Sequence, residues 1–434
     1  MSNITFSNLE KKFLLSMLLG IILPLMDSTA LNTLLPVLNK VFYQFPVYWI
    51  IQSYLLSIIF AIPLSAFLGQ KFGEDNIWRI CLLLFGMSSF IAGLTTNFYI
   101  LLFARIGQGV AAGLMMPVMQ TLVVRMLSEE KVRPALTTIS IPSAIAPIIA
   151  PILSVFFTTF LDYHFIFLIN IPFCLISLLL SYNIKYKKLD FHQPFDTIGL
   201  ILIIPSISIL IYALETVKNF IEFIALITVS SALYFLYHII KSKRNEVSII
   251  NFSLLKNKNF NYYIKILFSG SIIYYGGVLL FPLIFNDQEK IVLFIGVALS
   301  FHSLGTLCSR YLTNKFNILK ERTLLIISSL SILISSFLII ILIENINYNS
   351  IIIVLMFLRG AGVGLLTIIP MSSLYKGLNK EIIAQASSFS RLTTQFSASL
   401  GTACAGIFIS SPYICYILFI IMSLLSIFWT IKRD

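Results

Sequence analysis

Long apolar runs separated by short polar breaks repeat along the whole 434-residue chain. A helix needs about 20 mainly apolar residues to cross a bilayer, and these runs are of that length. Because a membrane-spanning segment must satisfy its backbone hydrogen bonds internally, the runs predict helices. We expect fourteen of them, near residues 13–38, 47–69, 77–96, 98–124, 135–158, 164–183, 197–215, 219–240, 260–285, 290–313, 322–343, 349–375, 383–409 and 412–431.

The composition agrees with this pattern. Hydrophobic residues make up 58% of the chain and charged residues only 11%, whereas soluble domains carry about 25% charge. We therefore predict an all-α polytopic membrane protein. The five cysteines all fall in apolar stretches without paired spacing, so they indicate neither a disulfide framework nor a metal site. We expect no cofactor.

The net charge of +12 is typical either of a nucleic-acid partner or of orientation by the positive-inside rule. With the N-terminus in the cytoplasm, the inner loops receive 23 Lys and Arg residues, and the outer loops receive only Lys40, Lys218 and Lys290. This split favours orientation over nucleic-acid binding. It predicts a multi-pass protein of the inner (cytoplasmic) membrane with both termini in the cytoplasm and an uncleaved first helix.

The longest polar stretches lie near 185–194 and 241–259, on either side of the seventh and eighth spans. We therefore expect an N-terminal six-helix bundle over 1–188, two linker helices with their cytoplasmic loops over 189–258, and a C-terminal six-helix bundle over 259–434. Two internal echoes support a duplicated bundle. Leu68–Gly73 resembles Leu312–Asn317, and Arg105–Leu114 resembles Arg359–Leu365.

Asp27 is a lone acid within the first apolar run. A carboxylate near the middle of a spanning helix costs about 2.5–3.5 kcal/mol, so it needs a partner or an aqueous cavity. At about 1.5 Å per residue, Asp27 and Arg105 both lie about 9 Å below the outer face of the bilayer, which predicts an ion pair. Such a pair could exchange a proton, hold two helices together without taking part in transport, or leave the acid to recognise a cationic substrate.

Five segments resemble the major facilitator superfamily, in particular its fourteen-span drug:proton antiporters of the EmrB/QacA type. They are Met26–Pro36 in the first span, Arg105–Gly113 in the fourth, Ala146–Pro151 in the fifth, Phe167–Pro172 in the sixth and Ala386–Gly401 in the thirteenth. The resemblance implies the major facilitator fold, with two six-helix bundles plus two extra central helices. It also implies proton coupling through Asp27 and Arg105, with substrate bound between the halves.

The loop after the second span departs from the pattern of that family. Gln70 replaces an acid that helps to lock the inner gate in the family, and Glu74 and Asp75 stand where a basic pair is typical. An amide can form hydrogen bonds but cannot form an ionic latch. Gln70 and Gly73 are therefore candidate gating residues.

Three prolines in the fifth span, Pro142, Pro147 and Pro151, should bend it. The bend is either a hinge between transport states or a fixed kink. Glycines at 107, 109 and 113 favour close helix packing. Arg359 and Arg391 are candidate second-half equivalents of Arg105. A further set of polar, aromatic and methionine residues could line a substrate cavity. These candidates are Asn32, Tyr54, Gln108, Met115, Met116, Tyr274, Tyr275, His302 and Met371.

No nucleotide-binding loop, metal-ligand cluster or nucleophile–base pair is recognisable, so we do not expect an enzyme. We predict proton-coupled export of amphipathic drug-like compounds by alternating access, with a small-molecule substrate, protons and the lipid bilayer as partners. The sequence does not indicate whether a periplasmic adaptor takes part. Two alternatives stay open, namely export of one specific metabolite, and a non-transporting membrane sensor or scaffold that keeps the fold.

Overall fold

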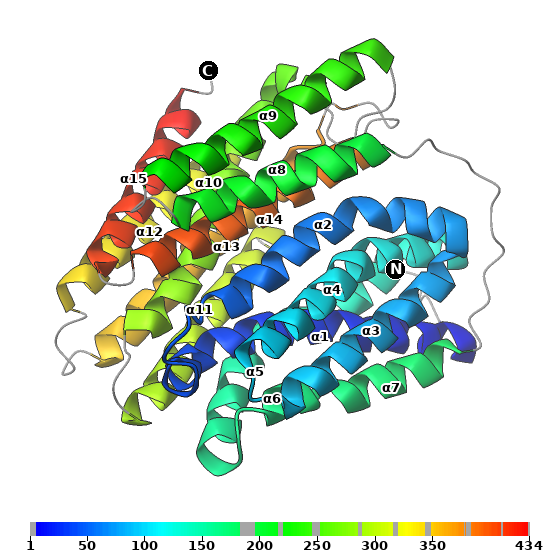
Figure 1. The fold of residues 1–434 in the computed structure, drawn as a ribbon, viewed down its shortest axis with the longest axis horizontal. Helices are drawn as coiled ribbons and strands as arrows, with labels where there is room; N and C mark the ends of the chain where they lie inside the picture. Colours follow the sequence, from blue (N-terminus) through cyan, green and yellow to red (C-terminus); the bar gives the residue numbers. More distant parts are fainter. Residues whose placement is uncertain are drawn as a thin grey trace. The chain divides into compact units, whose positions relative to one another are not determined.

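The computed structural model describes residues 6–182, 196–215, 220–244, 252–284, 289–315, 320–342, 349–376, 378, 383–408 and 411–432, and these contain helices but no strand. The chain divides into an N-terminal unit, Met1–Phe195, and a C-terminal unit, Asp196–Asp434. The elements of both units are labelled in Figure 1.

The N-terminal unit contains α1 to α7. Their bounds are α1 Asn8–Val41, α2 Trp49–Phe72, α3 Glu74–Leu94, α4 Phe98–Met126, α5 Glu129–Phe160, α6 Phe165–Leu168 and α7 Asn170–Ser181. The C-terminal unit contains α8 to α15. Their bounds are α8 Thr197–Glu215, α9 Phe220–Arg244, α10 Lys258–Ile284, α11 Glu289–Lys315, α12 Glu321–Leu342, α13 Asn349–Ser373, α14 Ile383–Ile407 and α15 Pro412–Ile431, with a short 3₁₀ turn at Phe252–Lys256.

Every predicted apolar run coincides with a helix, except that the run near 164–183 forms two. The interruption follows from Pro172, whose ring would clash with the carbonyl of Leu168 in a continuous helix. Accordingly α6 ends at Leu168 and α7 begins at Asn170. Among the described residues, eight helices are long and apolar enough to cross a membrane, and five further apolar helices are shorter.

The junction between α2 and α3 is very short. Gly73 is the only residue between the two helices, and its φ of 89° lies in the region that favours glycine. A side chain at this position would strain the backbone. This explains locally why a glycine stands there, whatever part it has in gating.

The two units use the same helix pairings. In the N-terminal unit, α1 packs on α5 and α7, and α4 packs on α2 and α3. In the C-terminal unit, α10 packs on α14 and α15, and α13 packs on α11 and α12. Six helices of one unit therefore correspond in order to six of the other, as the sequence echoes predict. The first helix α1 corresponds to α10, and α4 corresponds to α13.

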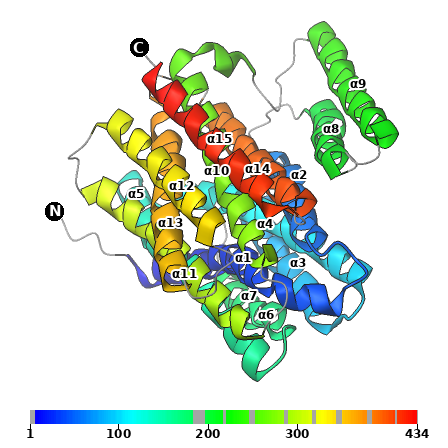
Figure 2. The same cartoon turned by 90° about the vertical axis from the view of Figure 1, so that its left-hand side faces the viewer.

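Helices α8 and α9 form a separate pair within the C-terminal unit. They lie side by side in both views (Figures 1 and 2). Two reciprocal hydrogen bonds join them, because the Ser206 hydroxyl donates to the Ser230 carbonyl at 2.8 Å and the Ser230 hydroxyl donates to the Ser206 carbonyl at 2.9 Å. One helix of the pair, α8, also contacts α14.

Candidate functional site

An ion pair joins α1 to α4 inside the N-terminal unit. Asp27 on α1 accepts a hydrogen bond from Nη1 of Arg105 on α4, and both side chains have no exposed surface. The equal depth of these two residues predicts their contact, and the structure confirms it. Because an isolated charge is very costly in such an environment, each residue stabilises the other.

Arg105 is held in place from three further directions. Its Nε donates to the Ile50 carbonyl at 3.1 Å, and Nη1 also donates to Oε1 of Gln108 at 2.7 Å. The Tyr54 ring lies 4.2 Å from the guanidinium carbon, within the range of a cation–π contact. The position of the guanidinium is therefore set by α2 as well as by its own helix.

A chain of side-chain amides and one hydroxyl closes the network around Asp27. The Gln108 amide donates to the Ser89 hydroxyl at 2.7 Å, and the Asn170 amide donates to the same hydroxyl at 3.3 Å. Asn170 also donates to the second carboxylate oxygen of Asp27 at 3.4 Å. Four helices, α1, α3, α4 and α7, thus contribute to one hydrogen-bond network around the Asp27 carboxylate.

Sequence reasoning missed Ser89 and Asn170 as members of this site. Asn170 belongs to the segment Phe167–Pro172 that resembles the superfamily, and it is a lone amide in an apolar run. A single amide in an apolar run is the sequence feature that could have identified Asn170 as a site residue. Ser89 gives no such signal, because serines are frequent in these helices and only the packing of α3 against α4 brings this one to Gln108.

The network can hold Asp27 as a carboxylate, since the acid accepts hydrogen bonds from a cation and an amide. A proton on Asp27 would remove the charge that Arg105 neutralises. Protonation therefore changes the strength of the α1–α4 contact. This is the chemical property that a proton-coupled conformational change requires.

Two predicted cavity residues, Tyr54 and Gln108, belong to this network and are buried. Asn32 donates from its side-chain amide to the Ser28 carbonyl at 3.0 Å within α1. Met115 is buried and Met116 is partly exposed. Whether these residues face a substrate stays a prediction.

The remaining candidates lie in the C-terminal unit. His302 on α11 is buried, its Nδ1 bonds to the Met356 carbonyl at 3.2 Å, and its ring stacks on Tyr274. Tyr274 and Tyr275 are partly exposed, and Met371 is 38% exposed. Arg359 on α13 is fully buried, and Arg391 on α14 is half-buried. A role in transport is a prediction for each of them.

Helix α5 runs without a break from Glu129 to Phe160 through the three predicted prolines. Pro142 and Pro147 are partly exposed, and Pro151 is buried. A proline has no backbone N–H group to donate within the helix. This weakening is consistent with either a hinge or a fixed kink, so both interpretations stay open.

The loop after the second predicted span has Gln70 where an acid is typical of the superfamily, but an ion pair that was not predicted from the sequence lies at the same junction. The side chain of Gln70 lies outside the described part of the structure. Glu74, the first residue of α3, is 3% exposed and pairs with Arg125 near the end of α4 at 2.7 Å. It also packs over Gly69 of α2. The α2–α3 junction is thus ionically attached to α4 by a residue other than the one typical of the family.

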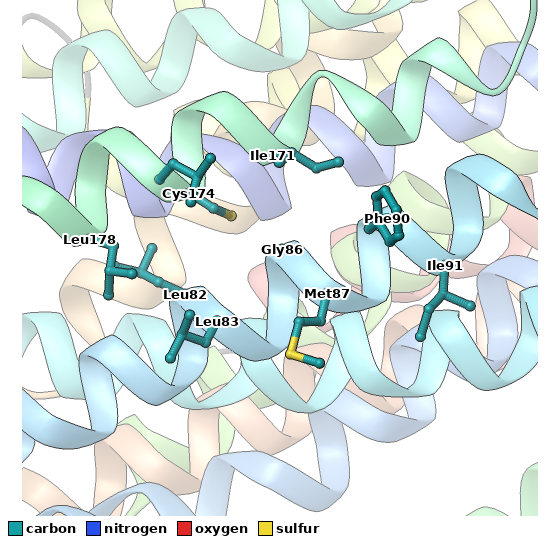
Figure 3. Close-up of a pocket in the computed structure, with 10 residues that line it drawn as sticks. Leu82, Leu83, Gly86, Met87, Phe90, Ile91, Ile171, Cys174 and Leu178 are labelled. Carbon is teal, nitrogen blue, oxygen red and sulfur yellow. The ribbon is translucent and has the colours of Figure 1, made fainter.

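An apolar groove of about 250 Å³ lies between α3 and α7 (Figure 3). Ten residues line it, namely Leu82, Leu83, Gly86, Met87, Phe90, Ile91, Ile171, Cys174, Leu175 and Leu178. None of them carries a charge or an amide. The groove therefore suits hydrocarbon, such as a lipid chain, better than a polar or charged solute.

Comparison with known proteins decides the family. The sequence model of the Major Facilitator Superfamily matches residues 17–402. The chain belongs to this superfamily. It is a multi-pass membrane transporter rather than an enzyme, as predicted from the composition and the sequence motifs.

Two curated relatives of this superfamily member show moderate similarity. "Putative multidrug resistance protein MdtD" of Pectobacterium carotovorum is 27% identical over 248 residues, which cover 56% of the chain and 53% of the relative. "Multidrug export protein EmrB" of Haemophilus influenzae is 27% identical over 283 residues, which cover 63% of the chain and 55% of the relative. The chain spans about half the length of the curated relatives it matches.

Solved superfamily structures share the fold over nearly the whole chain. The nucleoside transporter NupG superposes with a TM-score of 0.68 at 13% identity and covers 98% of the chain and 100% of its own. The xylose transporter XylE from E. coli, in a partially occluded inward-open conformation, superposes with a TM-score of 0.64 at 14% identity and covers 98% of both chains. These similarities identify the fold and not the substrate.

Proposed function

We propose that this transporter exports amphipathic drug-like compounds from the cytoplasm in exchange for protons. The observation that carries the proposal is the buried carboxylate of Asp27, held by Arg105 and Asn170. Buried ionisable groups in spanning helices mark ion pathways more often than structural sites, because their cost must be offset. The multidrug names of the MdtD and EmrB relatives support the choice of substrate class.

In this mechanism Asp27 alternates between two environments. When it is ionised, Arg105 holds α4 against α1 through the pair and through Gln108. When it takes up a proton, the charge–charge part of this contact is lost and the helices can rearrange. Release of the proton on the other side restores the pair. The substrate would bind midway across the bilayer between the two halves and move in the opposite direction.

The proposal includes a topology of fourteen spans in the inner membrane with both termini in the cytoplasm. The one-to-one correspondence of six helices in each unit supports an inverted or parallel duplication of the superfamily type. The remaining pair, α8 and α9, would be the two additional central helices. The predicted bundle limits, 1–188 and 259–434, leave this pair between the bundles.

The sensor alternative was favoured by Gln70, which cannot form an ionic latch, and by Ser154-Val155 in the fifth span. The pair between Glu74 and Arg125 supplies an ionic contact at the same junction as Gln70, which weakens the argument from that residue. The metabolite-exporter alternative differs only in substrate range. We therefore keep transport as the proposal, with the breadth of substrates as the quantity to measure.

The test uses the full chain in proteoliposomes with an imposed pH jump and a panel of fluorescent amphipathic compounds. We expect Asp27→Asn to insert into the membrane with lower stability, because Arg105 is left without its carboxylate, and to lose uphill transport. Asp162→Asn is the matched control, because Asp162 lies in the loop before α6 and its side chain is half exposed; it should transport as the wild type does. Undiminished gradient-driven transport by Asp27→Asn would refute the coupling role. Transport of a single compound would favour the metabolite exporter, and the absence of all transport would favour the sensor.

A further inference from the structure

The duplicated helices place a buried arginine in each unit. Arg105 lies on α4 and Arg359 lies on α13, which has the corresponding pairings. The helix ends repeat a charge contact too. In the N-terminal unit the first residue of α3, Glu74, pairs with Arg125. In the C-terminal unit the first residue of α12, Glu321, pairs with Lys376 at 2.6 Å.

The surroundings of the two arginines differ at one decisive point. Asp27 stands 19 residues after the start of α1 at Asn8, and Gly277 stands 19 residues after the start of α10 at Lys258. The guanidinium of Arg359 lies directly against Gly277, where a Cβ atom would overlap it. The C-terminal unit therefore has a glycine where the N-terminal unit has its carboxylate.

Nothing in the described part of the chain replaces the missing charge. Arg359 donates from Nη2 to the Ile273 carbonyl at 3.2 Å, while Nε and Nη1 have no hydrogen-bond partner there. Phe419 and Tyr416 of α15 present their rings at 5.1 and 5.7 Å from the guanidinium carbon. The Tyr416 hydroxyl is also buried and without a partner among the described residues.

This arrangement is electrostatically incomplete. An unpaired cation in a low-dielectric core is among the most expensive groups to bury, and ring contacts compensate only a small part of that cost. The two N–H groups of Nη1, which have no hydrogen-bond partner among the described residues, match a monovalent anion or one oxygen of a carboxylate. An anionic guest would give Arg359 the neutralisation that Arg105 receives from Asp27.

We propose that Arg359 is the centre of an anion-binding site in the C-terminal unit. The ligand is a small monovalent anionic group, either a free halide or carboxylate ion or the acid group of a transported substrate. Nη1 of Arg359 binds it. Gly277 is the specificity-determining position, because its lack of a side chain keeps an internal carboxylate away from the guanidinium.

The first experiment measures binding without transport, so its result is independent of the proposed export. The purified full chain in detergent is unfolded by heat in chloride, in formate and in a bulky organic sulfonate at equal ionic strength. A ligand that binds only the folded state raises the Tm as its concentration rises. We expect chloride and formate to raise the Tm by several degrees over the sulfonate. Equal Tm values in all three salts would overturn the proposal.

Matched variants assign the effect to Arg359. Gly277→Asp supplies an internal carboxylate and should abolish the anion dependence, whereas Gly277→Asn has the same size without the charge and should keep it. Equal dependence in the two variants would overturn the assignment. Because both side chains displace the guanidinium, Tyr416→Phe is a second test that changes no backbone contact. We expect it to raise the half-saturating chloride concentration by about tenfold, and an unchanged value would remove the hydroxyl from the site.

A second experiment separates the two sources of the anion, and this part rests on the proposed export. Uptake of an acidic compound and of its neutral methyl ester is compared in proteoliposomes. If the substrate supplies the anion, Gly277→Asp should lower transport of the acid by at least tenfold relative to the ester, and Gly277→Asn should not. If a free ion supplies it, Gly277→Asp should transport both compounds alike and independently of chloride. Anion dependence of the Tm would stand in either case.

Discussion

Asp27 and Arg105 stabilise the N-terminal unit only together, so the effects of replacing each of them on the free energy of unfolding are not additive. Both side chains are fully buried, so removal of one leaves an uncompensated charge in the core. Removal of both leaves two neutral groups whose burial costs little. This asymmetry distinguishes a neutralised pair from two independent polar contacts.

We therefore predict that Arg105→Leu lowers the free energy of unfolding by about 3–5 kcal/mol. The double variant Asp27→Asn/Arg105→Leu should recover most of this loss, because no charge remains buried. The free energies are measured by denaturant titration in mixed micelles. A double variant that is less stable than Arg105→Leu would show that the two residues do not neutralise each other.

Individual residues of the site were predictable to the extent that they break a local pattern. Asp27 and Arg105 are single charges in apolar runs, and their equal depth follows from helix geometry alone. Ser89 and Asn170 depend on which helices are neighbours, and no local pattern contains that information. The same reason explains why the sequence did not reveal the pair between Glu74 and Arg125.

At the scale of helices, the N-terminal unit depends on very close packing of α2 against α4. A Cβ atom at Gly109 would overlap the Tyr54 carbonyl, and one at Gly113 would lie 2.9 Å from the Ile58 carbonyl. These glycines thus act as small packing residues, in agreement with the interpretation from the sequence. Close approach also brings Tyr54 onto the guanidinium of Arg105.

We predict that Gly109→Ala destabilises the protein by about 1–3 kcal/mol, because the added methyl group must separate the two helices. Ile106→Ala on the same helix is the control, since Ile106 is 44% exposed and should change stability by only about 0.5 kcal/mol. Thermal unfolding in detergent compares the two variants. Equal effects would mean that α2 and α4 tolerate a larger separation.

A second prediction concerns the ion pair that joins α3 to α4. Glu74 is buried while Arg125 is one-quarter exposed, so water screens part of the attraction. We expect Glu74→Lys to destabilise the N-terminal unit by about 1–3 kcal/mol. Adding Arg125→Glu should restore at least half of the loss by reversing the pair. No recovery in the double variant would show that the two charges do not interact, and circular-dichroism melts give the values.

Helix positions were predictable along nearly the whole chain, because apolar runs of bilayer length have few alternatives. The run near 164–183 is divided at Ile169, where the backbone keeps helical dihedral angles, and Phe165–Ser181 still forms one apolar segment. The division follows from Pro172. The proline was visible in the sequence, but a proline near the start of a helix is also compatible with a single uninterrupted span.

Over the whole molecule, the duplication accounts for both the similarity of the two units and their difference. Corresponding helices keep their pairings and the ion pairs at their proposed cytoplasmic ends. Among the residues that the structure describes, however, the buried arginine is neutralised by a carboxylate in the N-terminal unit alone. A duplicated fold can assign different tasks to its halves in this way. In our proposals the N-terminal unit exchanges the proton and the C-terminal unit binds an anionic group.

The orientation of the C-terminal unit depends on whether α8 and α9 both cross the membrane. If both cross, the two units have the same orientation, and short loops at Thr96 and Ser411 face outward while Ser128 and Lys320 face the cytoplasm. If only one crosses, the C-terminal unit is inverted. We predict that a membrane-impermeant maleimide labels Thr96→Cys and Ser411→Cys in intact cells, and labels Ser128→Cys and Lys320→Cys only after permeabilisation. If the labelling pattern is reversed at Ser411 and Lys320 but not at Thr96 and Ser128, only one of α8 and α9 crosses the membrane. The number of spans is then odd and the C-terminus lies outside. The N-terminal unit keeps its orientation in that case, because its own loop charges set it.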